Sequence, residues 1–147
     1  MVVPAAVAHG GAGPGPHRQE NVEAAIAQAA GILEAGGSAV EAAVEACVIL
    51  ENDPVFNAGT GAVYRTDGSV LLDASLHSSD GRMGFVIAMR DTPNPIRVAA
   101  DLLDEEINGL AGGGARVWAD SKGHLKAAVE GRPPRVGAGD TVGIITR

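Results

Sequence analysis

Thr141 is the residue of this chain whose setting best suits a nucleophile. It follows a glycine-containing stretch and Asp140, and it begins a short apolar strand, TVGIIT. A lone threonine in a strand is ordinarily structural, but cleavage of the Asp140–Thr141 peptide bond would create a new N-terminal threonine. The α-amine of such a residue, with an ordinary pKa of about 7.7–8.0, can act as the general base for the adjacent hydroxyl. The pattern therefore suggests a self-cleaving precursor.

The other candidate residues give weaker signals. Four histidines, at positions 9, 17, 77 and 124, show no metal-ligand spacing, and the sequence contains no CxxC or HExxH motif. The stretch HGGAG at 9–13 is similar to an esterase oxyanion loop, but no GxSxG nucleophile elbow accompanies it. A glycine-rich loop after a strand can also hold phosphate, yet the Walker lysine and a complete GxGxxG are missing. We therefore favour the interpretation that these glycines only let the chain turn tightly.

The elements that must position these residues begin with a strand and two helices. The apolar run 2–8 ends in glycines and prolines, which is typical of a buried strand followed by a loop. Apolar residues at helical spacing then predict a helix that starts at Glu20 and is ended by the glycine pair 36–37. A second helix is predicted over 38–52, opened by the capping box SAVE and ended by Pro54, which disfavours helical geometry in the residue before it.

Strands and a third helix follow. AVYR at 62–65 and VLLD at 70–73 predict two strands joined by a turn at Asp67–Gly68. The run GFVIAM at 84–89 is continuously apolar, as expected of a strand buried on both faces. An Asn-Pro start and an Asn-Gly stop predict a third helix within 94–109. Two adjacent helices followed by several strands predict the α+β class.

Residues 122–140 lack any periodic pattern. Their sequence, KGHLKAAVEGRPPRVGAGD, combines mixed charge with adjacent prolines and several glycines. We interpret it as an exposed, mobile linker. The sequence thus predicts a core over 1–121, a linker over 122–140 and a terminal strand over 141–147.

Composition excludes several classes of protein. The length of 147 residues suits one domain, and a chain that is 46% hydrophobic and 20% charged is globular rather than disordered. The net charge of −7 argues against a general nucleic-acid binder. The single Cys47 cannot form an intramolecular disulfide and fits a core thiol. No signal-peptide pattern and no membrane-length apolar run occurs, so we expect a cytoplasmic protein without a membrane partner.

Several motifs, in a fixed order, resemble those of the N-terminal-nucleophile (Ntn) asparaginases, which include plant-type L-asparaginase/isoaspartyl peptidases, glycosylasparaginase and taspase. The motifs span nearly the whole chain: HGGAG at 9–13, GGSAVEAAVEACVILENDPVFNAGTGAV at 36–63, LDAS at 72–75, NPI at 94–96 and DTVG at 140–143. The resemblance implies a portion of a four-layer αββα sandwich. It also implies hydrolysis of L-asparagine or β-aspartyl (isoaspartyl) peptides.

The resemblance assigns roles to particular residues. Thr141 would be the nucleophile, released by autoproteolysis after Asp140, and Asn57 would lie beside it and orient it. His9 and its glycines would be structural. No cofactor is implied for catalysis. A structural sodium ion is implied, and such an ion suits carbonyl oxygens. Its ligands would be the main-chain carbonyls of Leu50, Glu51, Asp53, Phe56, Ala58 and Thr60.

The resemblance leaves the branch of the family open. Asp140 before the threonine is more like glycosylasparaginase and taspase than plant-type members, which usually have glycine. In this family the strand that begins at the nucleophile continues into a β subunit with the substrate-binding groups, and the usual assembly is (αβ)2. That half is missing from the 147 residues. We therefore expect an α-subunit portion, inactive alone. The alternative is a truncated, non-catalytic member that serves as an assembly or interaction module.

Overall fold

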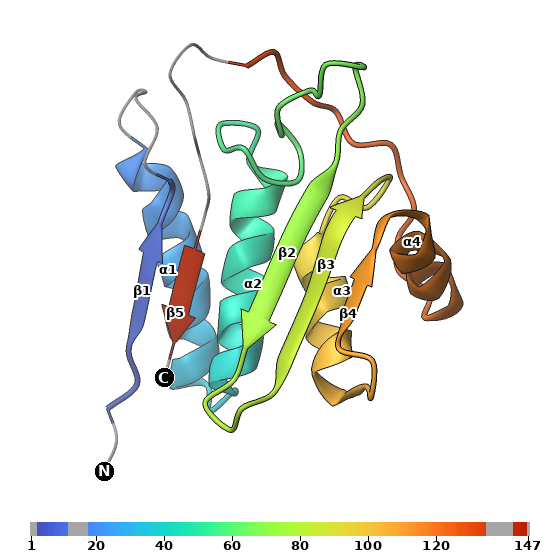
Figure 1. Cartoon of the computed structure of the whole chain (residues 1–147). Coiled ribbons are helices and arrows are strands. Elements are labelled where there is room, and N and C mark those ends of the chain that lie inside the picture. The colour runs from blue at the N-terminus through green and yellow to red at the C-terminus, as the bar shows by residue number, and fades with distance from the viewer. Residues whose placement is uncertain (1–2, 12–17, 135–142, 147) are drawn as a thin grey trace.

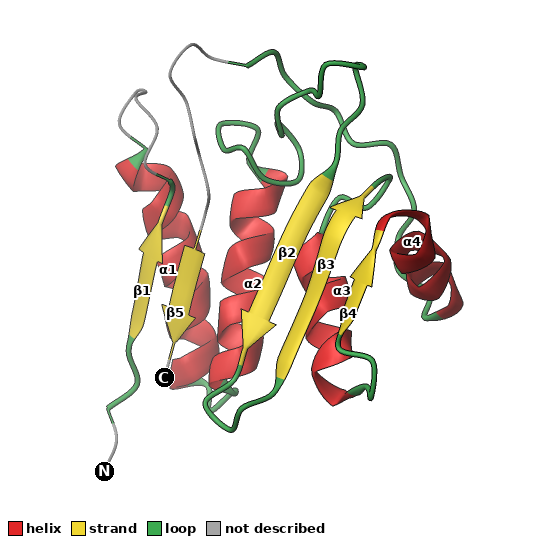
Figure 2. Cartoon of the chain, in the orientation of Figure 1, coloured by secondary structure: helices red, strands yellow, loops and turns green. Residues whose placement is uncertain are grey.

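The computed structural model describes residues 3–11, 18–134 and 143–146, which form a layer of strands against a layer of helices (Figure 1). The α+β class predicted from the sequence is confirmed, and Figure 2 separates the two kinds of element by colour. The strands are β1 (Ala6–His9), β2 (Leu72–His77), β3 (Met83–Met89), β4 (Gly109–Ala111) and β5 (Gly143–Thr146). The helices are α1 (Gln19–Glu34), α2 (Ala39–Asn52), α3 (Pro95–Asp101) and α4 (Gly112–Ser121), with a 3-10 turn, η1 (Leu102–Asp104), after α3.

The described strands form two separate sheets. β1 and β5 pair antiparallel, with Ala6 opposite Thr146. The other sheet has the order β2-β3-β4, with β2 antiparallel and β4 parallel to β3. β5 and β2 are neighbours in Figure 1 and point the same way, although the described residues form no ladder between them. Helix α2 lies behind both, because Ile144 of β5 and Leu76 of β2 pack in one apolar cluster with Val44 and Val48.

Small side chains let the first two helices pack closely. Their contact is lined by fully buried alanines: Ala25 and Ala29 of α1, and Ala42 and Ala46 of α2. Phe56, from the loop after α2, completes this cluster and is also fully buried. The loop after α2 is therefore part of the core rather than a surface excursion.

The ends of these two helices follow the sequence signals. Gly36 lies in the left-handed region (φ +84°), and its N–H donates to the Leu33 carbonyl at 3.1 Å, which closes α1. The Ser38 hydroxyl accepts a hydrogen bond from the Glu41 N–H at 3.1 Å and caps α2. α2 stops immediately before Asp53–Pro54, as predicted.

The predicted hairpin between 62–65 and 70–73 is wrong. The turn at Asp67–Gly68 is present, with Gly68 at φ +78°. The Arg65 N–H donates to the Ser69 carbonyl at 2.8 Å, but the flanks form no strand ladder with each other. β2 pairs with β3, and Val63 instead makes an isolated parallel bridge with Arg132. Local pattern identifies the turn, but it does not show that a distant segment takes the partner's place.

The third helix is shorter than predicted. α3 ends at Asp101 and η1 at Asp104, whereas the expected helix ran to the Asn-Gly pair at 108–109. The Asn94 side chain makes no capping hydrogen bond to α3. β4 and α4, which follow, were not predicted, because the glycines at 112–114 hide the helical pattern.

β3 is buried on one face rather than on both. Val86 and Met89 are buried against α3 and α4, whereas Ile87 is 49% exposed. Val7 of β1 and Ile145 of β5 are exposed as well. The difference from the prediction arises because the described helices cover only one side of the strands.

Residues 124–132 were predicted as part of the mobile linker 122–140, but backbone hydrogen bonds instead join them to the core. One example is the Arg132 N–H, which donates to the Ala62 carbonyl at 2.9 Å. Residues 135–142 lie outside the described part of the chain. The linker and its boundary with the terminal strand remain predictions there.

Candidate active site

The site loop, which we define as residues 53–61, begins with an aspartate that joins it to α1. The Asp53 Oδ1 accepts a hydrogen bond from the Val55 N–H at 3.0 Å, and its Oδ2 accepts one from Asn21 Nδ2 of α1 at 2.6 Å. The Asp53 carbonyl accepts from the Phe56 N–H at 3.2 Å. Because both carboxylate oxygens and the carbonyl are used, the start of the loop is fixed against α1.

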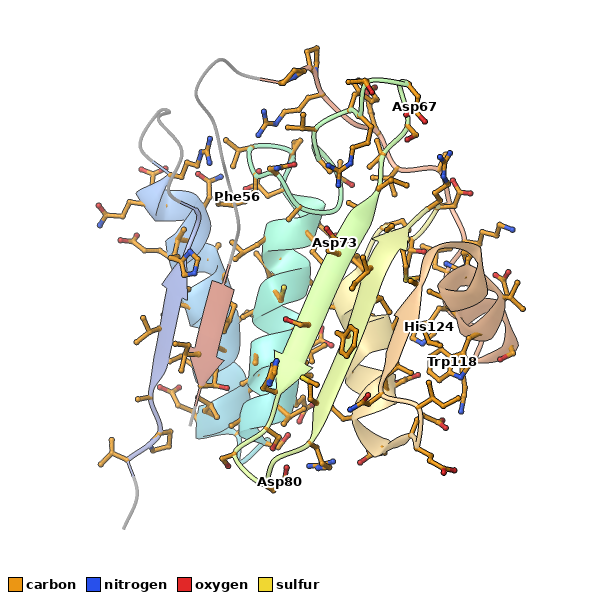
Figure 3. The ribbon with its side chains drawn as sticks, viewed as in Figure 1. Phe56, Asp67, Asp73, Asp80, Trp118 and His124 are labelled. Carbon is orange, nitrogen blue, oxygen red and sulfur yellow. The ribbon has the colours of Figure 1, made fainter. Side chains whose placement is uncertain are left out.

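Phe56 anchors the middle of the site loop. Its side chain is fully buried, beyond the upper end of α2 and toward α1 and β1 (Figure 3). A Cβ atom at Gly10 would lie 2.5 Å from Phe56 Cε1, so a larger residue at position 10 would displace the ring. The Arg18 guanidinium lies 5.7 Å from the ring centroid, within range of a cation–π interaction. Gly10 therefore has a packing role, which fits the structural interpretation of His9 and its glycines.

Two glycines turn the second half of the loop back to α2. Gly59 has φ +49°, and a Cβ there would lie 2.3 Å from the Glu51 carbonyl oxygen. Gly61 has φ +90°, and a Cβ there would lie 2.4 Å from the Pro54 carbonyl oxygen. The Thr60 N–H donates to the Glu51 carbonyl at 2.8 Å. Any other residue would need both a rare backbone conformation and a shift of neighbouring main chain.

Asn57 lies half-buried in this loop, beside a cavity. Its Oδ1 accepts a hydrogen bond from the Val63 N–H at 2.8 Å. The cavity has a volume of about 670 Å³ and extends along β2 and β3 from the site loop. Among residues 3–11, 18–134 and 143–146, the Asn57 Nδ2 group has no hydrogen-bond partner. Asn57 can therefore donate to a group placed in the cavity.

The predicted cleavage site, Asp140–Thr141, lies outside the described residues. The proximity of Asn57 to Thr141 therefore stays a prediction. The described chain resumes at Gly143, where β5 pairs with the end of β1. β5 is held at its other end by the Thr146 hydroxyl, which donates to the Ala39 carbonyl at 2.6 Å.

Glu51 is a buried carboxyl group that borders the same cavity. Its Oε1 accepts from the Ile96 N–H and its Oε2 from Asn94 Nδ2, both at 3.1 Å. Glu51 therefore caps α3, a role that the sequence had predicted for Asn94. Burial raises the pKa of Glu51 to about 8, although these hydrogen bonds and the nearby Arg97 lower it. The raised pKa favours the neutral form of this carboxyl group.

Cys47 precedes Glu51 by one helical turn and also lines the cavity. Burial raises the pKa of its thiol, and the charge of Glu51 raises it further. A thiol that stays protonated is a poor nucleophile. Cys47 therefore fits the predicted core role.

The carbonyl groups expected to bind sodium belong to the end of α2 and to the site loop. Those of Leu50, Glu51 and Asp53 each accept one backbone hydrogen bond, from Asp53, Thr60 and Phe56 respectively. A carbonyl oxygen has two lone pairs, so each can also face a cation. Carbonyls at a helix C-terminus carry partial negative charge, which favours a cation. In the described part of the chain no group of three or more His, Cys, Asp or Glu residues could hold a metal, so an ion here would depend on main-chain oxygens.

Comparison with known proteins gives the family. The family model described as asparaginase matches residues 2–130. The isoaspartyl peptidase/L-asparaginase of Macaca fascicularis is 46% identical over 110 residues, which cover 69% of this chain and 35% of the relative. The protein of the same name from Rattus norvegicus is 42% identical over 125 residues, which cover 80% and 38%. That from Synechocystis sp. is 51% identical over 69 residues, which cover 46% of this chain and 21% of the relative.

This chain belongs to the Ntn asparaginase family, as its motifs predicted. It spans between 35% and 40% of the length of the first relatives that it matches. None of the helices described here is long and apolar enough to cross a lipid bilayer.

Sequence reasoning missed the side-chain contacts that hold the site loop. An Asp-Pro pair after a helix is a known turn signal and could have identified the Asp53 carboxylate as a local acceptor. No comparable signal joins Asn21 to Asp53, because the two residues are 32 positions apart. The buried role of Glu51 was also missed, since a glutamate near a helix end is ordinarily exposed.

Proposed function

We propose that this chain is the α-subunit portion of an Ntn amidohydrolase that cleaves the side-chain amide of L-asparagine or the β-aspartyl peptide bond. One observation carries the proposal: within a chain of this family, Asn57 faces a cavity with a donor group that has no partner in the described structure. The relatives named isoaspartyl peptidase/L-asparaginase support the choice of substrates.

Thr141 is the proposed nucleophile, and it must first be released from its peptide bond. Hydrolysis of Asp140–Thr141 breaks the C–N bond, gives Asp140 a new carboxylate and leaves Thr141 with a free α-amine. β5 begins two residues later and is paired with β1. The hydroxyl of its Thr146 donates a hydrogen bond to the Ala39 carbonyl of α2. This attachment supports a new N-terminus that stays in place after the cut.

After release, the Thr141 amine accepts the proton of its own hydroxyl, and Oγ attacks the carbonyl carbon of the substrate amide. The C–N bond breaks, ammonia or the peptide amine leaves with the proton, and an aspartyl ester forms. Water then hydrolyses this ester, which releases the carboxylate product and restores the hydroxyl. In this proposal Asn57 Nδ2 donates a hydrogen bond to the nucleophile or to the developing oxyanion.

The partner in this proposal is the β half, with substrate-binding groups of its own, in an (αβ)2 assembly. The sheet face opposite the helices supports it, because Val7, Ile87 and Ile145 are exposed there. A second sheet packed on that face would bury these side chains and complete a four-layer αββα sandwich.

We also propose that a sodium ion steadies the site loop through the carbonyls of Leu50, Glu51, Asp53, Phe56, Ala58 and Thr60. The experiment is a thermal unfolding series in sodium, potassium or tetramethylammonium chloride at equal ionic strength. We expect a higher midpoint in sodium, because only the folded loop gathers these oxygens. Equal midpoints in the three salts would remove the ion from the proposal.

A second candidate function is an assembly or interaction module without catalysis. It is favoured by the exposed apolar side chains of Val7, Ile87 and Ile145, which offer a surface to a partner whether or not the chain catalyses a reaction. In this case Thr141 keeps its nitrogen in a peptide bond and has no amine to act as base.

The two candidates differ in a reconstitution experiment. The chain is assayed alone and with a β half that begins at a free threonine, using asparagine and a β-aspartyl dipeptide, and intact mass is measured on the joined precursor. We expect a break between Asp140 and Thr141, no activity from the chain alone, and loss of the break in Thr141→Ala. Asn57→Ala should lower kcat roughly 10²–10³-fold. An inactive mixture would favour the module, and activity of the uncut chain would contradict the mechanism.

A further inference from the structure

Residues 130–132, which we call the strap, lie along the chain that leaves the site loop. The strap precedes the proposed cleavage site in sequence. Three backbone hydrogen bonds join it to residues 61–64, and they give Val63 and Arg132 the geometry of a parallel bridge. The bonds run from the Gly61 N–H to the Glu130 carbonyl (2.8 Å), from the Arg132 N–H to the Ala62 carbonyl (2.9 Å) and from the Tyr64 N–H to the Arg132 carbonyl (3.0 Å).

The Val63 N–H points away from the strap. In an extended chain, successive N–H groups face opposite edges. The Tyr64 N–H donates to the strap, and the Val63 N–H donates to Asn57 Oδ1 at 2.8 Å. A single extended stretch therefore carries the strap on one edge and Asn57 on the other. The position of the Val63 N–H fixes the Asn57 amide group, and with it the direction of Nδ2.

Contacts at Gly131 leave the strap little room to shift. A Cβ atom there would lie 2.7 Å from both Tyr64 Cε1 and Val70 Cγ2, and 2.9 Å from the Ala62 carbonyl oxygen. Such separations are shorter than any ordinary carbon contact. A side chain at position 131 must therefore displace these neighbours or the strap itself, and the backbone contact with Ala62 favours displacement of the strap.

We infer that the strap is a positioning element for Asn57, and its effect on hydrolysis rests on the function proposed above. The strap holds the backbone that presents the Val63 N–H, and this N–H holds the Asn57 amide in the cavity. The segment that leads to the proposed cleavage site thus also orients a residue of the site. Catalysis after cleavage requires the strap to remain bound, although the chain beyond it has been cut.

Gly131→Val in the complete protein, with its β half, tests the inference. We expect kcat to fall roughly 10- to 100-fold with little change in KM, because a misplaced positioning group affects the reacting geometry rather than substrate binding. Gly114→Val is the matched control, since position 114 is exposed and a Cβ there meets no atom within 4 Å. If Gly131→Val does not fold, Gly131→Ala introduces the same crowded Cβ.

A double-mutant cycle with Asn57→Ala separates positioning from a general loss of structure. If the strap acts through Asn57, Gly131→Val lowers kcat in the parent protein but not in the Asn57→Ala background. If the two losses multiply, the strap acts independently of Asn57 and the inference is overturned.

Hydrogen exchange at the Val63 amide gives a readout that does not depend on catalysis. We expect Gly131→Val to speed this exchange at least about tenfold, and Gly114→Val to leave it unchanged. Unchanged exchange in Gly131→Val overturns the inference. A third outcome separates the inference from the proposed function. If Gly131→Val speeds exchange, but the parent and Asn57→Ala proteins hydrolyse substrate equally or not at all, the proposed function is wrong. The inference that the strap positions Asn57 is then still supported.

Discussion

Two regions of this molecule each bury an ionisable side chain, and they do so in different ways. Glu51, beside the site loop, is 3% exposed, and Arg116, on α4, is 6% exposed. Glu51 accepts two hydrogen bonds from neutral groups. Arg116 makes a larger set of contacts, all within 3.3 Å and one of them to a carboxylate. Its partners are Asp120 Oδ1, Thr92 Oγ1 and the carbonyls of Asp91, His124 and Leu125.

The difference follows from what each group can do with its proton. A guanidinium stays charged at any ordinary pH, so the fold has to satisfy its donors with acceptors. A carboxyl group can take up a proton instead, and burial has raised the pKa of Glu51 accordingly. The Arg116 region is therefore a fixed clamp between α4, the turn after β3 and residues 124–125. The Glu51 region, next to the candidate active site, changes its charge with pH.

The largest expected effect is a loss of stability on removal of Phe56, which anchors the site loop beside Glu51. Phe56→Ala should lower the free energy of unfolding by about 3–5 kcal/mol, because it empties a fully buried aromatic site. Urea denaturation measures this, with Val7→Ala, at an exposed position of β1, as the control. Gly10→Ala should also destabilise the parent protein through its contact with the ring, and less so when Phe56 is absent. Equal costs in the two backgrounds would contradict the packing described here.

Arg116→Ala should cost on the order of 3 kcal/mol, because the acceptors around it lose their donor while still buried. The loss should be nearly the same from pH 5 to 9. Arg90→Ala is the control, since that side chain is 58% exposed and its ion-pair distance to Asp67 is 3.9 Å. A loss no larger than that of Arg90→Ala would show that the clamp is not a stabilising element.

Glu51→Gln should change the pH dependence of stability. The folded protein binds the Glu51 proton more tightly than the unfolded chain, so this group makes the free energy of unfolding fall as pH rises from about 4.5 to about 8. Glutamine removes that fall, and the variant should gain stability relative to the parent across this window. Denaturation at a series of pH values measures it, with the exposed Glu106→Gln as the control. Parallel curves for Glu51→Gln and the parent would place the Glu51 pKa near its ordinary value.

His124→Gln should give the smallest effect, about 0.5–1 kcal/mol. His124 Nε2 lies 2.9 Å from Asp101 Oδ2, and its ring stacks on Trp118 with 6.5 Å between centroids (Figure 3). Trp118 is the single tryptophan of the chain, so its fluorescence reports this contact directly. Asp101→Asn should alter that fluorescence as well, and a spectrum identical to that of the parent would mean that the contact between His124 and Asp101 does not form in solution.

Signals confined to a few neighbouring residues predicted the structure well. The Gly36–Gly37 stop, the Ser38 cap and the break before Pro54 all form as expected. The predicted hairpin is wrong, because Val63 pairs with Arg132. The helix that begins with glycines 112–114 was not predicted. Alternation and capping describe neighbours along the chain, whereas these outcomes depend on partners far away in sequence.

The candidate site divides in the same way. The FNAG motif pointed to Asn57, and the structure places this side chain at a cavity. The hydrogen bond from Asn21 to Asp53, the raised pKa of Glu51 and the strap could not be predicted, since each joins segments at least 32 residues apart or depends on burial. The motif identifies a residue, but tertiary contacts determine its orientation.

The pairing of β1 with β5 has a consequence for how the chain folds during synthesis. Ala6 pairs with Thr146, so the contact closes a loop of nearly the whole sequence. Contacts between distant residues slow folding, because the entropy of loop closure is lost before the contact is gained. On the ribosome, β1 emerges long before β5 and lacks this partner until β5 has been made. Its unpaired edge and the exposed Val7 are open to aggregation or chaperone binding during that interval.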